Sequence, residues 1–73
     1  MQRELASLKK KIGTRVRERR NQLRISQEDL AFDAEISPTY LSQIEGGKRN
    51  TTIDTLYRIC TVLKMELSDL VKS

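Results

Sequence analysis

Hydrophobic residues recur every three or four positions along most of the chain, which is the spacing of one buried face of an α-helix. The first such stripe predicts a helix over about residues 4–23 and consists of Leu5, Leu8, Ile12, Val16 and Leu23. Gly13 lies inside this segment and lowers helix stability by about 1 kcal/mol, so we expect the first turns to fray. No alternating run of the kind that predicts a β-strand stands out.

Two short helices are predicted next, and each follows a residue type that caps helix N-termini. Ser26 precedes a helix expected over residues 27–34. Ser37 precedes another over about residues 38–45, with Pro38 at the first helical position, where a missing N–H costs nothing. About three residues join the two helices, which is the spacing of a helix-turn-helix.

The C-terminal third of the chain predicts two more helices. Thr52 is expected to cap the fourth, and a short last helix is expected near residues 67–71. The apolar face of the fourth consists of Leu56, Ile59, Cys60 and Leu63, so Cys60 is expected to be a buried structural thiol rather than a redox sensor. The pattern therefore predicts an all-α, compact five-helix fold, and we expect residues 1–73 to form one domain.

The outward face of the third helix has a composition suited to reading DNA bases. Leu41 and Ile44 set its buried direction, and the opposite side holds Thr39, Ser42 and Gln43, with Tyr40 on the flank. A glutamine amide can bridge adenine N6 and N7, and a threonine methyl can touch the thymine methyl. Any solvated helix also turns polar residues outward, so this face alone does not establish a recognition role.

The chain has a net charge of +4 over 73 residues, but the charge is unevenly distributed along it. Residues 1–24 carry nine basic and two acidic side chains (+7), residues 25–45 carry none and five (−5), and residues 46–73 carry five and three (+2). The helix pair is therefore acidic, and attraction to phosphate has to come from its flanks. Lys48, Arg49 and Asn50 form a cationic loop after the third helix, which Arg15, Arg17 and Lys9 to Lys11 are expected to flank, unless those lysines are only a solvated helix face.

Several function classes are disfavoured by the composition. One cysteine and no histidine provide neither an internal disulfide nor the usual zinc ligands, so we expect no metal and no cofactor. Neither a nucleophile–base pair nor a metal cluster can be assembled, so we expect no enzyme. The longest apolar run is three residues, 30–32, which predicts a cytoplasmic protein without membrane contact. The length leaves no room for an effector domain, so no small-molecule effector is expected.

The combined motif resembles the lambda-repressor/Cro-type (XRE-family) helix-turn-helix domain over residues 12–71. Within that family it is most similar to the controller proteins of restriction–modification systems. The residues that carry the resemblance are 16–20, 25–31, Ala34, Ile36, Ser37, 40–45 and 47–50.

The resemblance implies a set of DNA contacts and one structural ion pair. Gln27 matches a glutamine that contacts a phosphate and braces the recognition helix, and Arg20 and Glu45 match a largely buried salt bridge. Positions that touch bases or nearby phosphates are matched by Thr39, Tyr40 and Gln43, and backbone-contacting positions by Ser37, Ser42, Lys48, Arg49 and Asn50.

The sequence departs from the family pattern at several turns. Arg24, Glu35 and Lys64 stand where glycine is usual, so these turns are either strained or bent differently, at about 1–2 kcal/mol for each strained residue. Arg19 occupies a usually apolar position, and Thr51 replaces a usual proline.

Apolar residues near the C-terminus exceed what one short helix needs. Met65, Leu67, Leu70 and Val71 are therefore predicted to form a homodimer seam, the alternative being closure of the monomer core. Phe32 is expected to fold against the first helix, or else to contact a partner.

The expected function is a sequence-specific DNA-binding transcriptional regulator that binds double-stranded DNA as a homodimer on a palindromic operator. A controller-type role is favoured. The alternative is a phage-type repressor, or an antitoxin-like protein whose main role is to bind a protein partner, as the acidic helix pair and Phe32 suggest.

Overall fold

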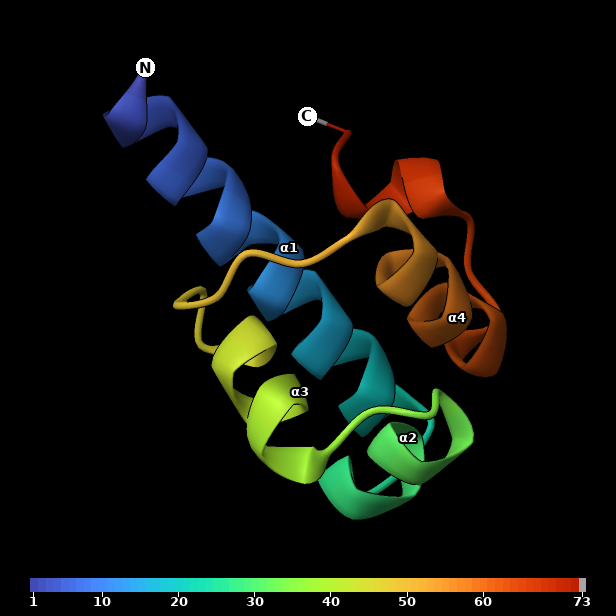
Figure 1. Ribbon diagram of the computed structural model, residues 1–73. Coiled ribbons are helices and arrows are strands. Elements are labelled where there is room, and N and C mark those ends of the chain that lie inside the picture. The colour runs from blue at the N-terminus through green and yellow to red at the C-terminus, as the bar shows by residue number, and fades with distance from the viewer. Residues whose placement is uncertain (73) are drawn as a thin grey trace.

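Four α-helices and one short 3₁₀ helix follow one another along residues 1–72, the part of the chain that this computed structural model describes (Figure 1). No strand occurs within that range. The all-α prediction is confirmed, and the elements are α1 (Gln2–Gln22), α2 (Gln27–Asp33), α3 (Pro38–Glu45), α4 (Ile53–Leu63) and η1 (Leu67–Leu70).

The expected count of five α-helices is wrong because the last element is a 3₁₀ turn. Only four residues separate Glu66 from Val71, too few for a stable α-helix. The Asp69 amide donates to the Glu66 carbonyl at 3.0 Å, and the Asp69 carboxylate accepts from the Glu66 amide at 2.9 Å. These two bonds close a single tight turn.

Helix α1 is the longest element, and the other elements pack along its C-terminal part (Figure 1). It packs against α3, α4 and η1, while α2 packs against α3 and α4. The first turn of α1 is helical from Gln2, so the expected fraying is not seen. The core combines residues of all five elements, and its fully buried larger side chains are Val16, Leu30, Leu41, Ile59, Leu63 and Leu70.

Side-chain caps begin the three shorter α-helices, as predicted. The hydroxyls of Ser26, Ser37 and Thr52 accept from the backbone N–H three residues later, at 3.0, 3.0 and 3.1 Å. Each cap satisfies one of the backbone donors that a helix N-terminus leaves free. The start of α3 is thus set by the Ser37–Pro38 pair.

The three turns that lack the family's glycines keep a left-handed backbone. Arg24, Glu35 and Lys64 have φ values of 58°, 62° and 55°. The turns are therefore strained rather than bent differently, because a Cβ is unfavourable in this region. Arginines stabilise the same helix ends: Arg19 Nε donates to the Leu63 carbonyl at 2.9 Å, which explains a charged residue at a usually apolar position.

Replacing Lys64 by glycine should raise the free energy of unfolding by about 1 kcal/mol, because glycine adopts positive φ without a Cβ penalty. Urea unfolding followed by circular dichroism measures the change. The matched control is Lys64→Ala, which removes the same charge but keeps a Cβ. An equal gain in both variants would mean that charge, not backbone strain, limits this turn.

Three predicted side-chain positions are wrong. Phe32 does not fold against α1; its side chain is 82% exposed. Leu70 is fully buried in the monomer core and cannot belong to a dimer seam, because η1 turns it inward to pack with α1 and α4. Arg15 does not flank the loop after α3, since its guanidinium donates to the carbonyls of Asp69 and Lys72.

Cys60 is buried, as predicted, on the inner face of α4. Desolvation raises the pKa of its thiol to about 11, and the carboxylates of Asp69 and Glu66 add to that rise. The thiol is thus kept protonated and unreactive, which fits a packing role.

Candidate nucleic-acid interface

Helix α3 exposes the residues that the helical periodicity assigned to its outer face. Thr39 and Ser42 are exposed and Gln43 is partly exposed, whereas Leu41 and Ile44 are buried. The helix lies along one side of α1, and the α2–α3 turn is at the lower end of the molecule in Figure 1. A polar, uncharged helix face is therefore directed to solvent.

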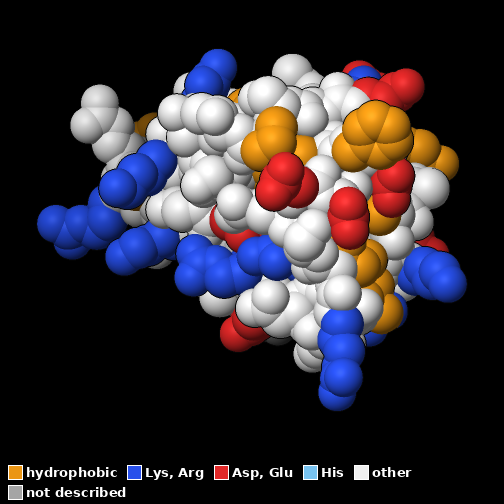
Figure 2. Space-filling model, turned by 90° about the horizontal axis from the view of Figure 1, so that it is seen from below, with side chains coloured by type: hydrophobic (Ala, Val, Ile, Leu, Met, Phe, Trp, Pro, Cys, Tyr) orange, Lys and Arg blue, Asp and Glu red, His pale blue; other side chains and the backbone are white. Residues whose placement is uncertain are grey.

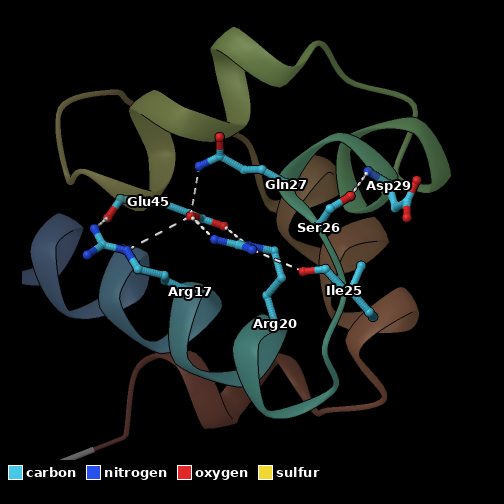
Figure 3. A network of polar contacts seen from close by, with 7 residues as sticks. All are labelled: Arg17, Arg20, Ile25, Ser26, Gln27, Asp29 and Glu45. Carbon is cyan, nitrogen blue, oxygen red and sulfur yellow. Dashed lines mark hydrogen bonds and ion pairs between the residues drawn. The ribbon is translucent and has the colours of Figure 1, made fainter.

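A buried carboxylate ties this helix to α1 and α2 (Figure 3). Glu45 is 3% exposed, and its two oxygens accept from Arg20 Nε at 2.7 Å and Arg20 Nη2 at 3.0 Å. Gln27 Nε2 donates to the same carboxylate at 3.0 Å. The structure thus contains the Arg20–Glu45 pair that the resemblance implied, in the two-pronged geometry that suits arginine and carboxylate.

The ion pair also fixes the turn between α1 and α2. Arg20 Nη1 donates to the Ile25 carbonyl at 3.0 Å, so one guanidinium joins three segments of the chain. The hydrogen bonds that Arg20 donates to Glu45 raise the pKa of Arg20 above its already high ordinary value, which keeps the guanidinium charged. Every buried side-chain nitrogen and oxygen within residues 1–72 has a hydrogen-bond partner.

Arg17 and Gln27 lie on either side of this network at the molecular surface. Arg17 Nη2 donates to the Glu45 backbone carbonyl at 3.0 Å, at the end of α3, and its side chain remains 52% exposed. A shallow hollow runs between α1, α2 and the end of α3. Its lining consists of Arg17, Arg20, Gln27, Ser42, Gln43, Glu45, Gly46 and Lys48.

The loop after α3 holds three exposed polar residues, Lys48, Arg49 and Asn50, and Arg49 contacts the outer face of α3. Arg49 Nη1 donates to Gln43 Oε1 at 2.6 Å, and its guanidinium lies 4.9 Å from the centre of the Tyr40 ring. The sequence separation of six residues between Arg49 and Gln43 gave no sign of this contact, because it depends on how the loop bends back.

Charged side chains are unevenly distributed on the face seen from the α2–α3 end (Figure 2). Lysine and arginine side chains extend from the left as a band across the middle, with others on the right and lower right, and several acidic side chains lie near hydrophobic ones to the right of centre. The negative charge of the helix pair is partly hidden, since Glu45 is buried and paired with Arg20.

Sequence reasoning missed one apolar surface, on α4. Ile53 is 73% exposed and Tyr57 is 63% exposed. Their i, i+4 spacing on one flank of the buried stripe was the available clue. Of the predicted seam residues, Val71 is 48% exposed, whereas Met65 and Leu67 pack against the core and are partly buried.

Residues 16–70 match the helix-turn-helix family. The chain belongs to the XRE-type helix-turn-helix family. The control protein C.BamHI of Bacillus amyloliquefaciens is 38% identical over 60 residues, 81% of this chain and 74% of that protein. The transcriptional regulator RamB of Mycobacterium tuberculosis is 46% identical over 55 residues, but the 75% of this chain that matches spans only 12% of RamB.

The fold of this helix-turn-helix chain is also that of a solved controller protein. The restriction–modification controller C.AhdI of Aeromonas hydrophila superposes with a TM-score of 0.82 at 34% identity, over 85% of this chain and 94% of the other. Neither a group of His, Cys, Asp or Glu residues arranged for a metal ion nor a helix suited to crossing a membrane occurs in the described part of the chain.

Proposed function

We propose that this helix-turn-helix chain is a cytoplasmic, sequence-specific DNA-binding transcriptional regulator of the restriction–modification controller type, folded as a single domain over residues 1–73. The observation that carries the proposal is the outer face of α3, which exposes uncharged hydrogen-bonding side chains on a helix that the buried Glu45–Arg20–Gln27 network anchors to α1 and α2. Family membership and the relatives named control and controller proteins support it.

The contacts divide between base reading and phosphate binding. Helix α3 enters the major groove, and the residues facing base edges are Thr39, Tyr40 and Gln43. Backbone contacts come from Gln27, Ser37, Ser42, Lys48, Arg49, Asn50 and Arg17, which border the hollow or the helix ends around α3. Phosphate contacts supply affinity and position, whereas base contacts supply discrimination.

A homodimer would present two such helices to half-sites about one turn of DNA apart on a palindromic operator. Exposed apolar side chains in the C-terminal half, Ile53, Tyr57 and Val71, support such an association, with the partly buried Met65 and Leu67 beside the core. The partner of each subunit is then a second copy, and neither a cofactor nor a small-molecule effector is part of the proposal.

The test is binding to the DNA upstream of the protein's own gene against a scrambled duplex, measured by fluorescence anisotropy at two salt concentrations. We expect about a 1000-fold or greater preference for the specific DNA. Lys48→Ala should weaken binding to both duplexes and reduce the salt slope by about 1, because one phosphate contact is lost. Equal affinity for both duplexes would contradict sequence-specific function.

A second candidate function, binding of a protein partner, is favoured by the environment of Phe32. This side chain is 82% exposed and borders a hollow lined by Glu28, Asp29, Ile36 and Pro38. An apolar ring among carboxylates would suit a basic partner surface with an apolar pocket, as an antitoxin-like protein would need.

Phe32→Ala separates the two candidates. It should leave DNA affinity within about twofold, because the ring lies outside the proposed contacts, and should reduce regulation of a reporter gene if a partner docks there. Glu18→Ala, an exposed change on α1, is the control. Unchanged reporter output in Phe32→Ala would contradict partner binding at this site and leave DNA binding as the proposed function.

A further inference from the structure

Arg49 is held from two directions by residues of α3. Its Nη1 donates to Gln43 Oε1 at 2.6 Å, and its guanidinium lies over the Tyr40 ring at 4.9 Å. The Tyr40 hydroxyl in turn donates to Thr51 Oγ1 at 3.0 Å. We call these four residues (Gln43, Arg49, Tyr40 and Thr51) the α3–loop lock, because they join the recognition helix to the loop that follows it.

The chemistry of the lock fixes the orientation of the Gln43 amide. A guanidinium has only donors, whereas a glutamine side chain has one acceptor oxygen and an NH₂ donor. The contact with Arg49 therefore uses the Gln43 oxygen and leaves its NH₂ group for other partners. Stacking on Tyr40 holds the guanidinium plane, so this arrangement exists before any DNA arrives.

An amide held in this way is biased against the usual reading of adenine. A free glutamine accepts from adenine N6 and donates to adenine N7 at the same time. The Gln43 oxygen keeps a second lone pair, but the Arg49 guanidinium, which has only donors, lies 2.6 Å from it. An adenine N6 donor that approaches this oxygen therefore meets the N–H groups and the positive charge of Arg49. Guanine offers two acceptors, O6 and N7, in the major groove, whereas adenine would bring its N6 donor against these donors.

We propose that Arg49 is a specificity-determining residue that, by placing its guanidinium against the Gln43 amide oxygen, makes the pair a donor-rich reader that selects guanine over adenine. The inference rests on the proposed DNA-binding function and deepens it. It alters the role of Arg49, which sequence comparison assigned to the DNA backbone alone. Lys48 carries the same charge in the same loop but takes no part in the lock.

The test selects binding sites from a random double-stranded DNA pool with four full-length proteins: wild type, Gln43→Ala, Arg49→Lys and Lys48→Ala. The base pair that Gln43 reads is the one whose preference disappears in Gln43→Ala. At that position wild type should favour guanine over adenine by about tenfold. Lysine keeps the charge but has neither the planar fork nor the stacking, so Arg49→Lys should free the amide and shift the preference to adenine.

The control Lys48→Ala should bind all sequences more weakly while keeping the guanine preference. The proposal is overturned if wild type prefers adenine at this position, if Gln43→Ala removes no preference, if Arg49→Lys keeps guanine, or if Arg49→Lys abolishes all binding. Thermal unfolding of each variant verifies that it is folded. If wild type enriches no sequence at all, the proposed function fails instead, which distinguishes the two outcomes.

Discussion

Glu45→Ala should lower the free energy of unfolding by about 3–5 kcal/mol, the cost of leaving a buried charge without its partner. Arg20 is only 13% exposed and would lose both hydrogen bonds to the carboxylate, and Gln27 would lose its acceptor. Such a loss is a large share of the 5–15 kcal/mol typical of a folded protein. Urea unfolding followed by circular dichroism measures it.

Two further variants distinguish the loss of the ion pair from a non-specific loss of stability. Glu18→Ala removes an exposed carboxylate from α1 and should change stability by less than about 0.5 kcal/mol. Arg20→Met combined with Glu45→Met removes both charges and should be less destabilised than the sum of the two single changes. Additive losses would show that the two side chains do not act as a pair.

Gly13→Ala should destabilise the protein by about 2 kcal/mol or more, although alanine is the better helix former by about 1 kcal/mol. A Cβ at this position would lie 2.3 Å from the Ile44 carbonyl oxygen and 2.6 Å from that of Glu45. Both are backbone atoms, so α1 and the end of α3 would have to move apart. Because α3 carries the proposed DNA-reading residues, DNA affinity should fall as well.

Gly46→Ala is the matched control for this contact. Its Cβ would be 3.4 Å from the Ser42 carbonyl, at the edge of ordinary contact, and its φ of −81° suits any residue. We expect a change below about 0.5 kcal/mol in thermal or urea unfolding. A Gly13→Ala protein as stable as wild type would mean that the two helices are not in fixed backbone contact.

Capping residues and apolar spacing predicted the helices, because the interactions that start and orient a helix join residues close in the sequence. Ser26, Ser37 and Thr52 bond to amides three residues away, and the apolar stripe of α4 marks its buried face directly. The predicted helix boundaries agree with the observed ones to within about two residues. The resemblance also identified Arg20 and Glu45, which are 25 residues apart and have no local sign of pairing.

The errors came from tertiary contacts that periodicity does not encode. Gly13 was taken as a weak point in α1, yet it is the place where α3 approaches too closely for a side chain. Leu70 was assigned to a dimer seam, but it is buried in the monomer core. The direction in which a short terminal turn points its side chains depends on tertiary packing against α1 and α4, which the local sequence does not show. The lock between Arg49 and Gln43 required the course of a loop, and so it escaped sequence reasoning altogether.

Base-analogue interference tests most directly whether α3 enters the major groove of a specific site. Duplexes of the preferred site would carry 7-deazapurines, which lack the major-groove N7, or 3-deazaadenine, which lacks the minor-groove N3, one position at a time. We expect 7-deazapurines to weaken binding in two clusters about one helical turn apart, and 3-deazaadenine to have little effect. Loss of binding with 3-deazaadenine alone, or with neither analogue, would contradict the account.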